Sequence, residues 1–115
     1  MSDNVVLINV EEGLSRVMNN AKLFSKLLGK FKIDPSLSEI ETAFAQGAVD
    51  TAKNSAHTLK GLAANLSLTE LFKQVLELET QIKGGTMNTQ QLALVKDVYA
   101  QTLTEADKVI EKYAG

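Results

Sequence analysis

Residues 56–65 read AHTLKGLAAN and contain His57, the only histidine of the 115-residue chain. Apolar residues recur at three- and four-residue steps through and around this stretch, a spacing that predicts an amphipathic helix from about Ala48 to Asn65. The apolar stripe consists of Val49, Ala52, Ala56, Leu59, Ala63 and Leu66. At about 100° per residue, His57 points roughly 130° away from the centre of that stripe. The helix is therefore expected to bury one face and to present the imidazole ring to solvent.

The exposed face of this predicted helix combines small and polar residues around the imidazole. Asn54, Gly61 and Ala64 lie on the side of His57, and Lys60, three residues further on, is close enough to reach the same point. A glycine inside a helix costs about 1 kcal/mol relative to alanine, so Gly61 requires a reason. Either it leaves space for a partner to approach the ring, or it allows a neighbouring helix to pack closely.

The remaining sequence predicts further helices with recognisable ends. Asn9 and Glu12 have the spacing of a capping box, which starts a short helix at Val10, and residues 18–20 interrupt the helical pattern before a second helix over 21–32. Asp34 and Pro35 are typical of an N-cap followed by the first helical residue. The helix that they start is predicted to end at Gly47.

Two longer helices complete the pattern. Ser67 and Glu70 form a second capping box, which starts a helix near Leu68 that ends at residues 84–85, a glycine pair. A final helix is predicted over 89–113. Amphipathic helices joined by short turns favour an all-α fold, an antiparallel four-helix bundle core with additional short N-terminal helices. The length suits one domain over residues 1–115.

Glu79 departs from the pattern of its helix, because it lies only about 40° from the centre of the apolar stripe, whereas Glu77 points away. A carboxylate that faces the core needs a partner. Counted from the hairpin turn, His57 lies roughly ten residues back and Glu79 roughly twelve forward, so at about 1.5 Å per residue the two are within side-chain reach. In the alternative, Glu79 extends to solvent at the edge of the stripe and His57 is an ordinary surface residue.

A contact between these side chains would change the reactivity of the imidazole. A carboxylate that accepts the Nδ1 hydrogen of His57 fixes the tautomer, leaves the Nε2 lone pair free, and stabilises positive charge as Nε2 attacks an electrophile. Lys60 can neutralise an anion bound at Nε2. A nucleophilic nitrogen beside an ammonium group suits a phosphoryl group, and no oxyanion hole is evident.

Composition excludes several other classes of function. The net charge of −2 and the pI near 5.4 argue against a nucleic-acid partner. The chain has no cysteine, so it lacks disulfides and thiolate metal sites, and no clustered carboxylates predict a metal site. The N-terminal residues do not resemble a signal peptide, no apolar run predicts a membrane span, and a cytoplasmic location is expected. Residues 84–85 are not followed by Lys-Ser/Thr, so no ATP-binding loop is predicted and no cofactor is expected.

The run from Ala56 to Gly61, continued by residues 64–66 (ANL), resembles the signature of histidine-containing phosphotransfer domains of bacterial phosphorelays. The resemblance extends over most of the chain, including residues 76–79 (LELE) on the next helix. It implies a helical bundle in which His57 accepts phosphate through Nε2, Lys60 assists the phosphoryl group, Gly61 provides space, and Glu79 hydrogen-bonds the other ring nitrogen. The family often has glycine at the position of Ser67 and a small polar residue at the position of Leu62.

The resemblance also implies partners. A receiver domain of a response regulator or hybrid kinase would bring an aspartyl phosphate and its Mg²⁺, and it would dock on the face of Asn54, Gly61 and Ala64. The chain is then a phosphoryl carrier, expected to be monomeric, rather than an autonomous kinase. Two alternatives remain open: a dimeric phosphoacceptor module of a sensor kinase, and a non-catalytic adaptor that binds receivers without accepting phosphate.

Overall fold

The computed structural model describes residues 6–114, which form six helices and no strand. These are α1 (Val10–Arg16), α2 (Ala21–Lys32), α3 (Ser36–Gln46), α4 (Val49–Asn65), α5 (Thr69–Lys83) and α6 (Thr89–Ala114). The predicted all-α class and the bundle architecture are confirmed. No helix in this range has the length and apolar character that a membrane span requires.

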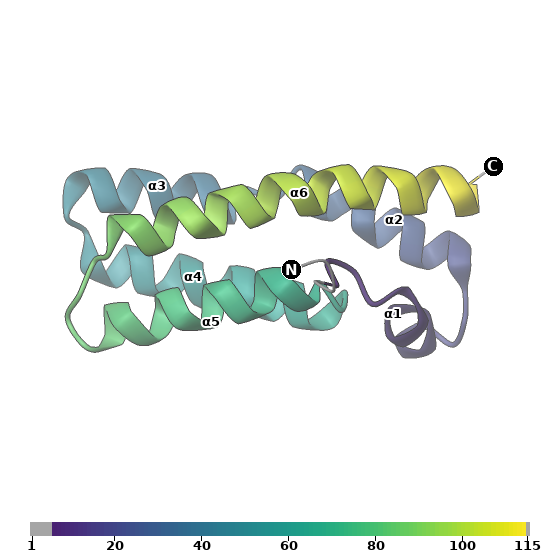
Figure 1. Ribbon diagram of the computed structural model, residues 1–115, viewed down its shortest axis with the longest axis horizontal. Coiled ribbons are helices and arrows are strands. Elements are labelled where there is room, and N and C mark those ends of the chain that lie inside the picture. The colour runs from purple at the N-terminus through teal and green to yellow at the C-terminus, as the bar shows by residue number, and fades with distance from the viewer. Residues whose placement is uncertain (1–5, 115) are drawn as a thin grey trace.

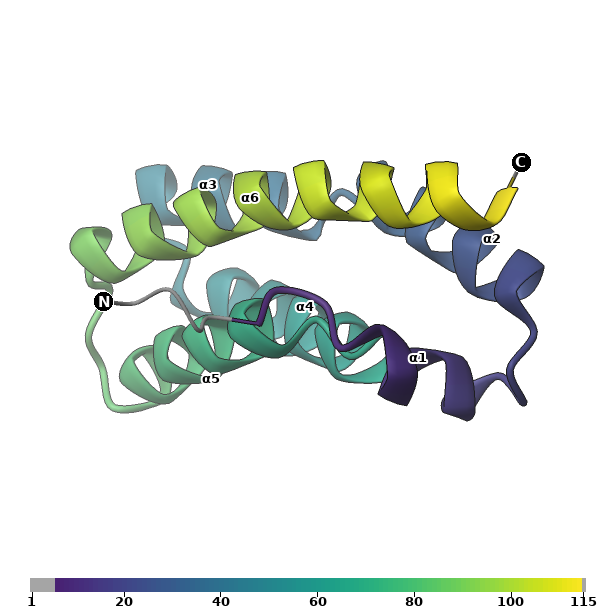
Figure 2. The same ribbon diagram turned by 45° about the vertical axis from the view of Figure 1, so that its right-hand side comes forward.

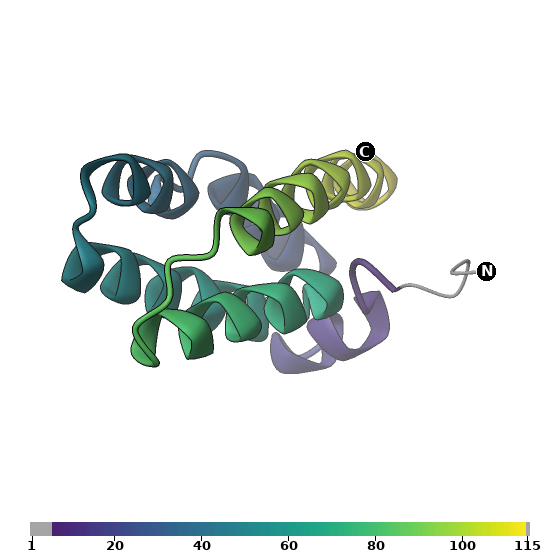
Figure 3. The same cartoon turned by 60° about the vertical axis from the view of Figure 1, so that its left-hand side comes forward.

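The helices form two layers, which Figures 1 and 3 show from different sides. One layer holds the antiparallel pair α4 and α5, and the other holds α6 beside α2 and α3, which follow one another along it. Helices α3, α4, α5 and α6 make the four-helix core, and α2 packs along the second half of α6. The ring of Phe31 on α2 lies 5.0 Å from that of Tyr99 on α6, between ring centroids, and Tyr99 donates a hydrogen bond to the Phe31 carbonyl oxygen.

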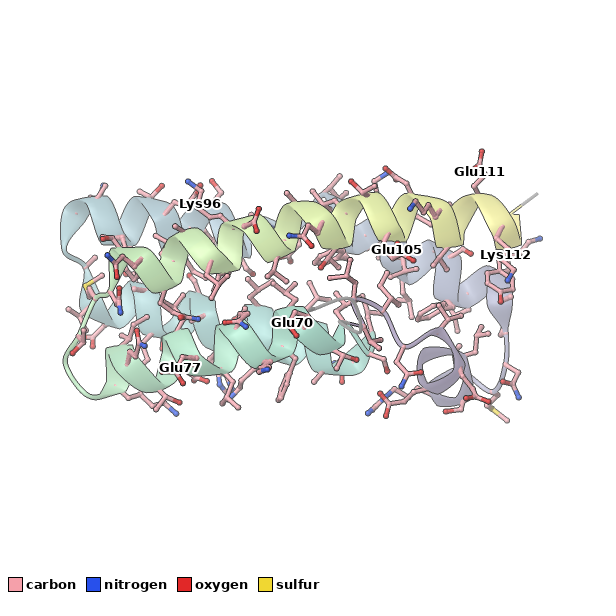
Figure 4. All side chains as sticks on the ribbon, viewed as in Figure 1. Glu70, Glu77, Lys96, Glu105, Glu111 and Lys112 are labelled. Carbon is pink, nitrogen blue, oxygen red and sulfur yellow. The ribbon has the colours of Figure 1, made fainter. Side chains whose placement is uncertain are left out.

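One apolar core fills the space between the layers. Its fully buried large apolar side chains come from the part of the chain that runs from α2 to α6: Phe24, Phe31, Leu28, Ile40, Leu59, Leu68, Leu71, Leu78, Ile82, Val75 and Val95. Apart from Glu79, which is buried, the charged side chains lie outside this core. Glu111 on α6, for example, projects clear of the bundle in Figure 4. The apolar stripes therefore decide which face of each helix turns inward. The assignment of residues 1–115 to one domain stays a prediction.

Most predicted helix ends agree with the structure. The Asn9 side chain accepts a hydrogen bond from the Glu12 amide at 3.1 Å, as the capping box requires. Gly47 ends α3 with a left-handed φ of 66°, and Gly84 follows the last residue of α5. The prediction for Asp34 and Pro35 was wrong by one residue: Pro35 is the N-cap and α3 begins at Ser36, although the Asp34 carboxylate accepts the Ser36 amide hydrogen at 2.9 Å.

The second predicted capping box was wrong. Leu68, not Ser67, is the N-cap of α5, and no side chain caps that helix. Ser67 has φ 58° and lies just after α4, where its amide bonds the Ala64 carbonyl and the Leu68 amide bonds the Ala63 carbonyl. This hydrogen-bond pattern ends a helix with a left-handed residue, a position that usually holds glycine. The left-handed backbone therefore gives a physical reason for the glycine that the family often has at the position of Ser67.

One residue of the predicted α4 stripe was also placed wrongly. Val49 has 44 % of its surface exposed, because it is the first residue of α4 and lies at the end of the packed stripe. The stripe residues from Ala52 to Leu66 are buried. Leu62, which departs from the family pattern, is half-buried and packs against the core. The burial of the stripe fixes which side of α4 remains available to a partner.

Candidate functional site

His57 lies on the solvent-facing side of α4, with 69 % of its side chain exposed. Its Nδ1 atom is 3.1 Å from Oε2 of Glu79, which α5 contributes from the antiparallel neighbour. A carboxylate only accepts hydrogen bonds, so this contact requires the hydrogen on Nδ1 and leaves the lone pair on Nε2. No other hydrogen bond to the ring is found within residues 6–114. Counting residues from the hairpin turn predicted that His57 and Glu79 lie at similar positions along the helix axis, and the structure brings their side chains together.

Glu79 is almost completely buried, with 2 % of its side chain exposed. The alternative in which it extends to solvent is therefore wrong. Three cationic or donor groups surround its two oxygens: Lys60 Nζ is 2.6 Å from Oε1, whereas His57 Nδ1 and Lys83 Nζ lie 3.1 and 3.5 Å from Oε2. A buried carboxylate is costly unless it is paired, and here both of its oxygens have partners.

The charge on Glu79 follows from these contacts. Burial acts to raise the pKa of Glu79, but hydrogen bonds from Lys60 and His57 and the positive charges of Lys60 and Lys83 together outweigh it. The pKa of Glu79 consequently lies below its ordinary value of 4.5. Near neutral pH the carboxylate is ionised and acts as a charged acceptor for the imidazole. Charge-assisted hydrogen bonds of this kind are roughly twice as strong as neutral ones.

The structure places Lys60 on Glu79, with 21 % of its side chain exposed. Lys83, which the sequence interpretation missed, is a second ammonium group on the same carboxylate and is 58 % exposed. Its position four residues after Glu79 on α5 was the available signal, because residues at that spacing are neighbours on a helix surface. The ring therefore has one lysine from its own helix and one from the adjacent helix close to it.

The predicted docking residues lie on the accessible side of α4. Asn54 and Gly61 are exposed, and Ala64 is half-buried. Apart from its chain neighbours and the adjacent backbone of its own helix, a Cβ atom built on Gly61 would meet no atom within 4 Å. Close helix packing therefore does not explain this glycine, and the space beside the ring is open.

A pocket adjoins this face between α1 and the turn that joins α4 to α5. Figure 2 shows where α1 lies relative to that pair of helices. The pocket of about 230 Å³ is lined by Glu12, Arg16, Ala63, Ala64, Ser67, Leu68, Thr69 and Phe72. The α1 segment is held there by a hydrogen bond from the Asn9 amide to the Ser67 carbonyl at 2.9 Å. The contribution of α1 was not predicted, since nothing in the sequence spacing relates it to α4.

In the part of the chain that the structure describes, no group of three or more His, Asp or Glu side chains is arranged to hold a metal ion.

The chain is similar to one protein family. The family model described as the Hpt domain matches residues 32–108, which is more than half of the chain and includes α3, α4 and α5. A search of curated proteins found no match, and a search of solved structures found none.

Proposed function

Because the chain belongs to the family of histidine-containing phosphotransfer (Hpt) domains, we propose that His57 accepts a phosphoryl group on Nε2 from the aspartyl phosphate of a receiver domain and passes it to another receiver aspartate. Hpt domains act in histidine phosphotransfer within phosphorelays and interact with receiver domains. The observation that carries the proposal is the exposed imidazole whose Nδ1 is held by a buried, ionised carboxylate, with His57 inside the segment that the family model matches.

The transfer step uses the lone pair that Nε2 retains. Nε2 attacks the phosphorus atom of the aspartyl phosphate in line, the Nε2–P bond forms, and the P–O bond to the aspartate breaks. The electron pair of that bond returns to the aspartate as its carboxylate. The ring keeps its Nδ1 hydrogen and becomes positively charged, and Glu79, 3.1 Å away, stabilises that charge. Transfer to the next receiver reverses these bond changes.

We assign three residues to the chemistry and three to docking. His57 is the phosphoacceptor, Glu79 orients it, and Lys60 contributes positive charge for the phosphoryl group from its position on Glu79. Asn54, Gly61 and Ala64 form the docking face, and the pocket between α1, α4 and α5 extends that face with apolar surface. Any Mg²⁺ belongs to the receiver, and the proposed state of the chain is a monomer in the cytoplasm.

The test is phosphotransfer from a receiver domain labelled with radioactive phosphate, compared between wild type and His57→Gln. We expect label on the wild type alone, stable to base and labile to acid, as a phosphohistidine requires. Equal labelling of His57→Gln would refute the proposal. Receiver binding without label on either protein would support the adaptor instead.

The alternative of a dimeric phosphoacceptor module is separated by solution mass. The described residues supply all four core helices from a single chain, which favours a monomer. A monomer measured at micromolar concentration would exclude an obligate dimer. A stable dimer would overturn this part of the proposal.

A further inference from the structure

Two ammonium groups lie close to His57, and they differ in how firmly Glu79 holds them. Lys60 Nζ lies 2.6 Å from Oε1 and the Lys60 side chain is 21 % exposed, whereas Lys83 Nζ lies 3.5 Å from Oε2 and its side chain is 58 % exposed. A short, largely desolvated ion pair is costly to break, while a long, exposed one contributes little. Lys83 is therefore the cation that can leave the carboxylate at small cost.

Lys83 is also placed beside the reacting ring. It shares the Oε2 atom with His57 Nδ1, so its ammonium group and the imidazole contact the same oxygen. Because α4 and α5 are antiparallel, the two lysines start from opposite sides of His57 along the helix axis. The backbone of Lys83 lies about 6 Å beyond that of Glu79, toward the start of α4, and the backbone of Lys60 lies about 4.5 Å beyond that of His57, toward the end of α4. The imidazole thus lies between the two lysines along the helix axis.

Phosphorylation would change the charge balance at this point. A phosphoryl group carries roughly two negative charges near pH 7 and offers three acceptor oxygens. If Lys83 turns from Oε2 to such an oxygen, Glu79 still keeps Lys60 on Oε1 and the ring on Oε2, so the buried carboxylate does not lose its compensation. The exchange replaces a weak contact with one to a more highly charged group.

We propose that Lys83 is a phosphoryl-binding residue of this domain: it leaves Glu79 when His57 is phosphorylated and contacts a phosphoryl oxygen, while Lys60 stays on Glu79. This inference rests on the proposed function. It predicts that Lys83 stabilises the phosphorylated state of His57 and so helps to set how the phosphoryl group is shared between this chain and a receiver.

The experiment measures the equilibrium distribution of label between His57 and a receiver domain for wild type, Lys83→Gln and Lys83→Arg. Loss of an exposed charge contact should lower the ratio of phosphorylated His57 to phosphorylated receiver, and with it the share on His57, in Lys83→Gln; the ratio should fall by about two- to fivefold. Lys83→Arg should keep most of the wild-type share, because it keeps the charge. The matched control is Lys73→Gln on the same helix, since Lys73 is exposed and lies about 15 Å from Lys83 along the axis.

The sign of the change distinguishes direct contact from an effect through Glu79. If Lys83 only weakened the carboxylate as an acceptor, its removal would strengthen the hydrogen bond to Nδ1, favour the positively charged phosphoimidazole, and raise the share on His57. A raised share, or a share equal to that of Lys73→Gln, would overturn the proposal while leaving His57 as the phosphoacceptor.

The small phosphoryl donor phosphoramidate separates this failure from failure of the proposed function. Attack by Nε2 on its phosphorus breaks the P–N bond and releases ammonia, so His57 is labelled without any receiver. The side-chain ¹⁵N signal of Lys83 should then shift more than that of Lys60. Label on His57 without this difference would refute the role of Lys83 alone. Absence of label from His57 with both donors would refute the proposed function together with the inference.

Discussion

Replacing Glu79 with alanine removes the buried carboxylate that holds the imidazole, and the contacts of this residue allow the effect on transfer to be estimated. The ionised acceptor lies 3.1 Å from Nδ1, and a hydrogen bond to a charged group contributes about 1.5–3 kcal/mol. If this stabilisation is realised as the ring becomes positive, its loss slows transfer by about 10- to 100-fold, since about 1.4 kcal/mol corresponds to a factor of ten. Glu79→Gln keeps an uncharged acceptor of the same shape and should lose less, about 3- to 10-fold.

The same substitution must leave the bundle folded for this reasoning to hold. Lys60 loses its partner but is partly exposed, so the cost should stay below the roughly 3–5 kcal/mol measured for breaking fully buried pairs and within the roughly 5–15 kcal/mol stability of a typical domain. The assay is single-turnover transfer from a labelled receiver, with thermal unfolding followed by circular dichroism. Glu77→Ala is the matched control, because Glu77 lies two residues earlier on α5 and is exposed. Figure 4 labels this residue. A folded Glu79→Ala protein that transfers phosphate within twofold of the control would remove Glu79 from the mechanism.

Three further predictions concern the docking face, the hairpin turn and pH. Gly61→Leu should fold at least as stably as wild type, because the added Cβ meets no atom within 4 Å outside the adjacent helix backbone, but it should slow transfer from a receiver at least tenfold. A normal transfer rate would disprove the open-space interpretation. The control is Gly29→Leu on α2, where the added Cβ is equally free of contacts. Ser67→Gly should raise the free energy of unfolding in urea by about 1 kcal/mol, since it removes a left-handed non-glycine residue and a buried hydroxyl without a hydrogen-bond partner; lower stability would contradict this. The folded-state pKa of Glu79 lies below its ordinary value of 4.5, so the ionised carboxylate stabilises the fold above about pH 4.5, and this stabilisation is lost as pH falls through the lower folded-state pKa. Glu79→Gln should therefore lose less free energy of unfolding than wild type in that acid range. Equal losses in the two proteins would count against the ion pairs of Glu79.

The parts of the fold that followed from sequence are those governed by local rules. The periodicity of apolar residues predicted six helices. Glycines at 47 and 84–85 predicted two of their ends, because each follows the last apolar residue of a stripe, where glycine commonly ends a helix. Ser67 was misassigned because serine is a good N-cap and the spacing to Glu70 was right. The deciding factor was the hydrogen bonding of the preceding helix, whose end places Ser67 in a left-handed conformation.

The candidate site also has a part that local sequence rules predicted and a part that they did not. The contact of His57 with Glu79 was accessible from sequence because two helices joined by a short turn must be antiparallel, and a count of residues from that turn gives relative height. The positions of flexible side chains were not accessible in this way. A lysine has four rotatable bonds, so the sequence places its Cα but not its ammonium group, and Lys83 became part of the site only when its contact with Oε2 was known. The pocket formed with α1 depends on packing between segments far apart in sequence, which no local pattern encodes.

The geometry of this site depends on the α4–α5 hairpin more than on any single contact. His57 and Lys60 come from one helix, Glu79 and Lys83 from the other, and the turn at residues 66–68 sets the height and rotation of one pair relative to the other. A shift of one residue in that turn would move α5 by about 1.5 Å and rotate it by about 100°, which would turn Glu79 away from the ring. The left-handed Ser67, the hydrogen bond to it from Asn9 of the segment before α1, and the burial of Leu66 and Leu68 all hold this turn in one register. Residues that never contact a phosphoryl group thus determine whether the imidazole has its carboxylate partner.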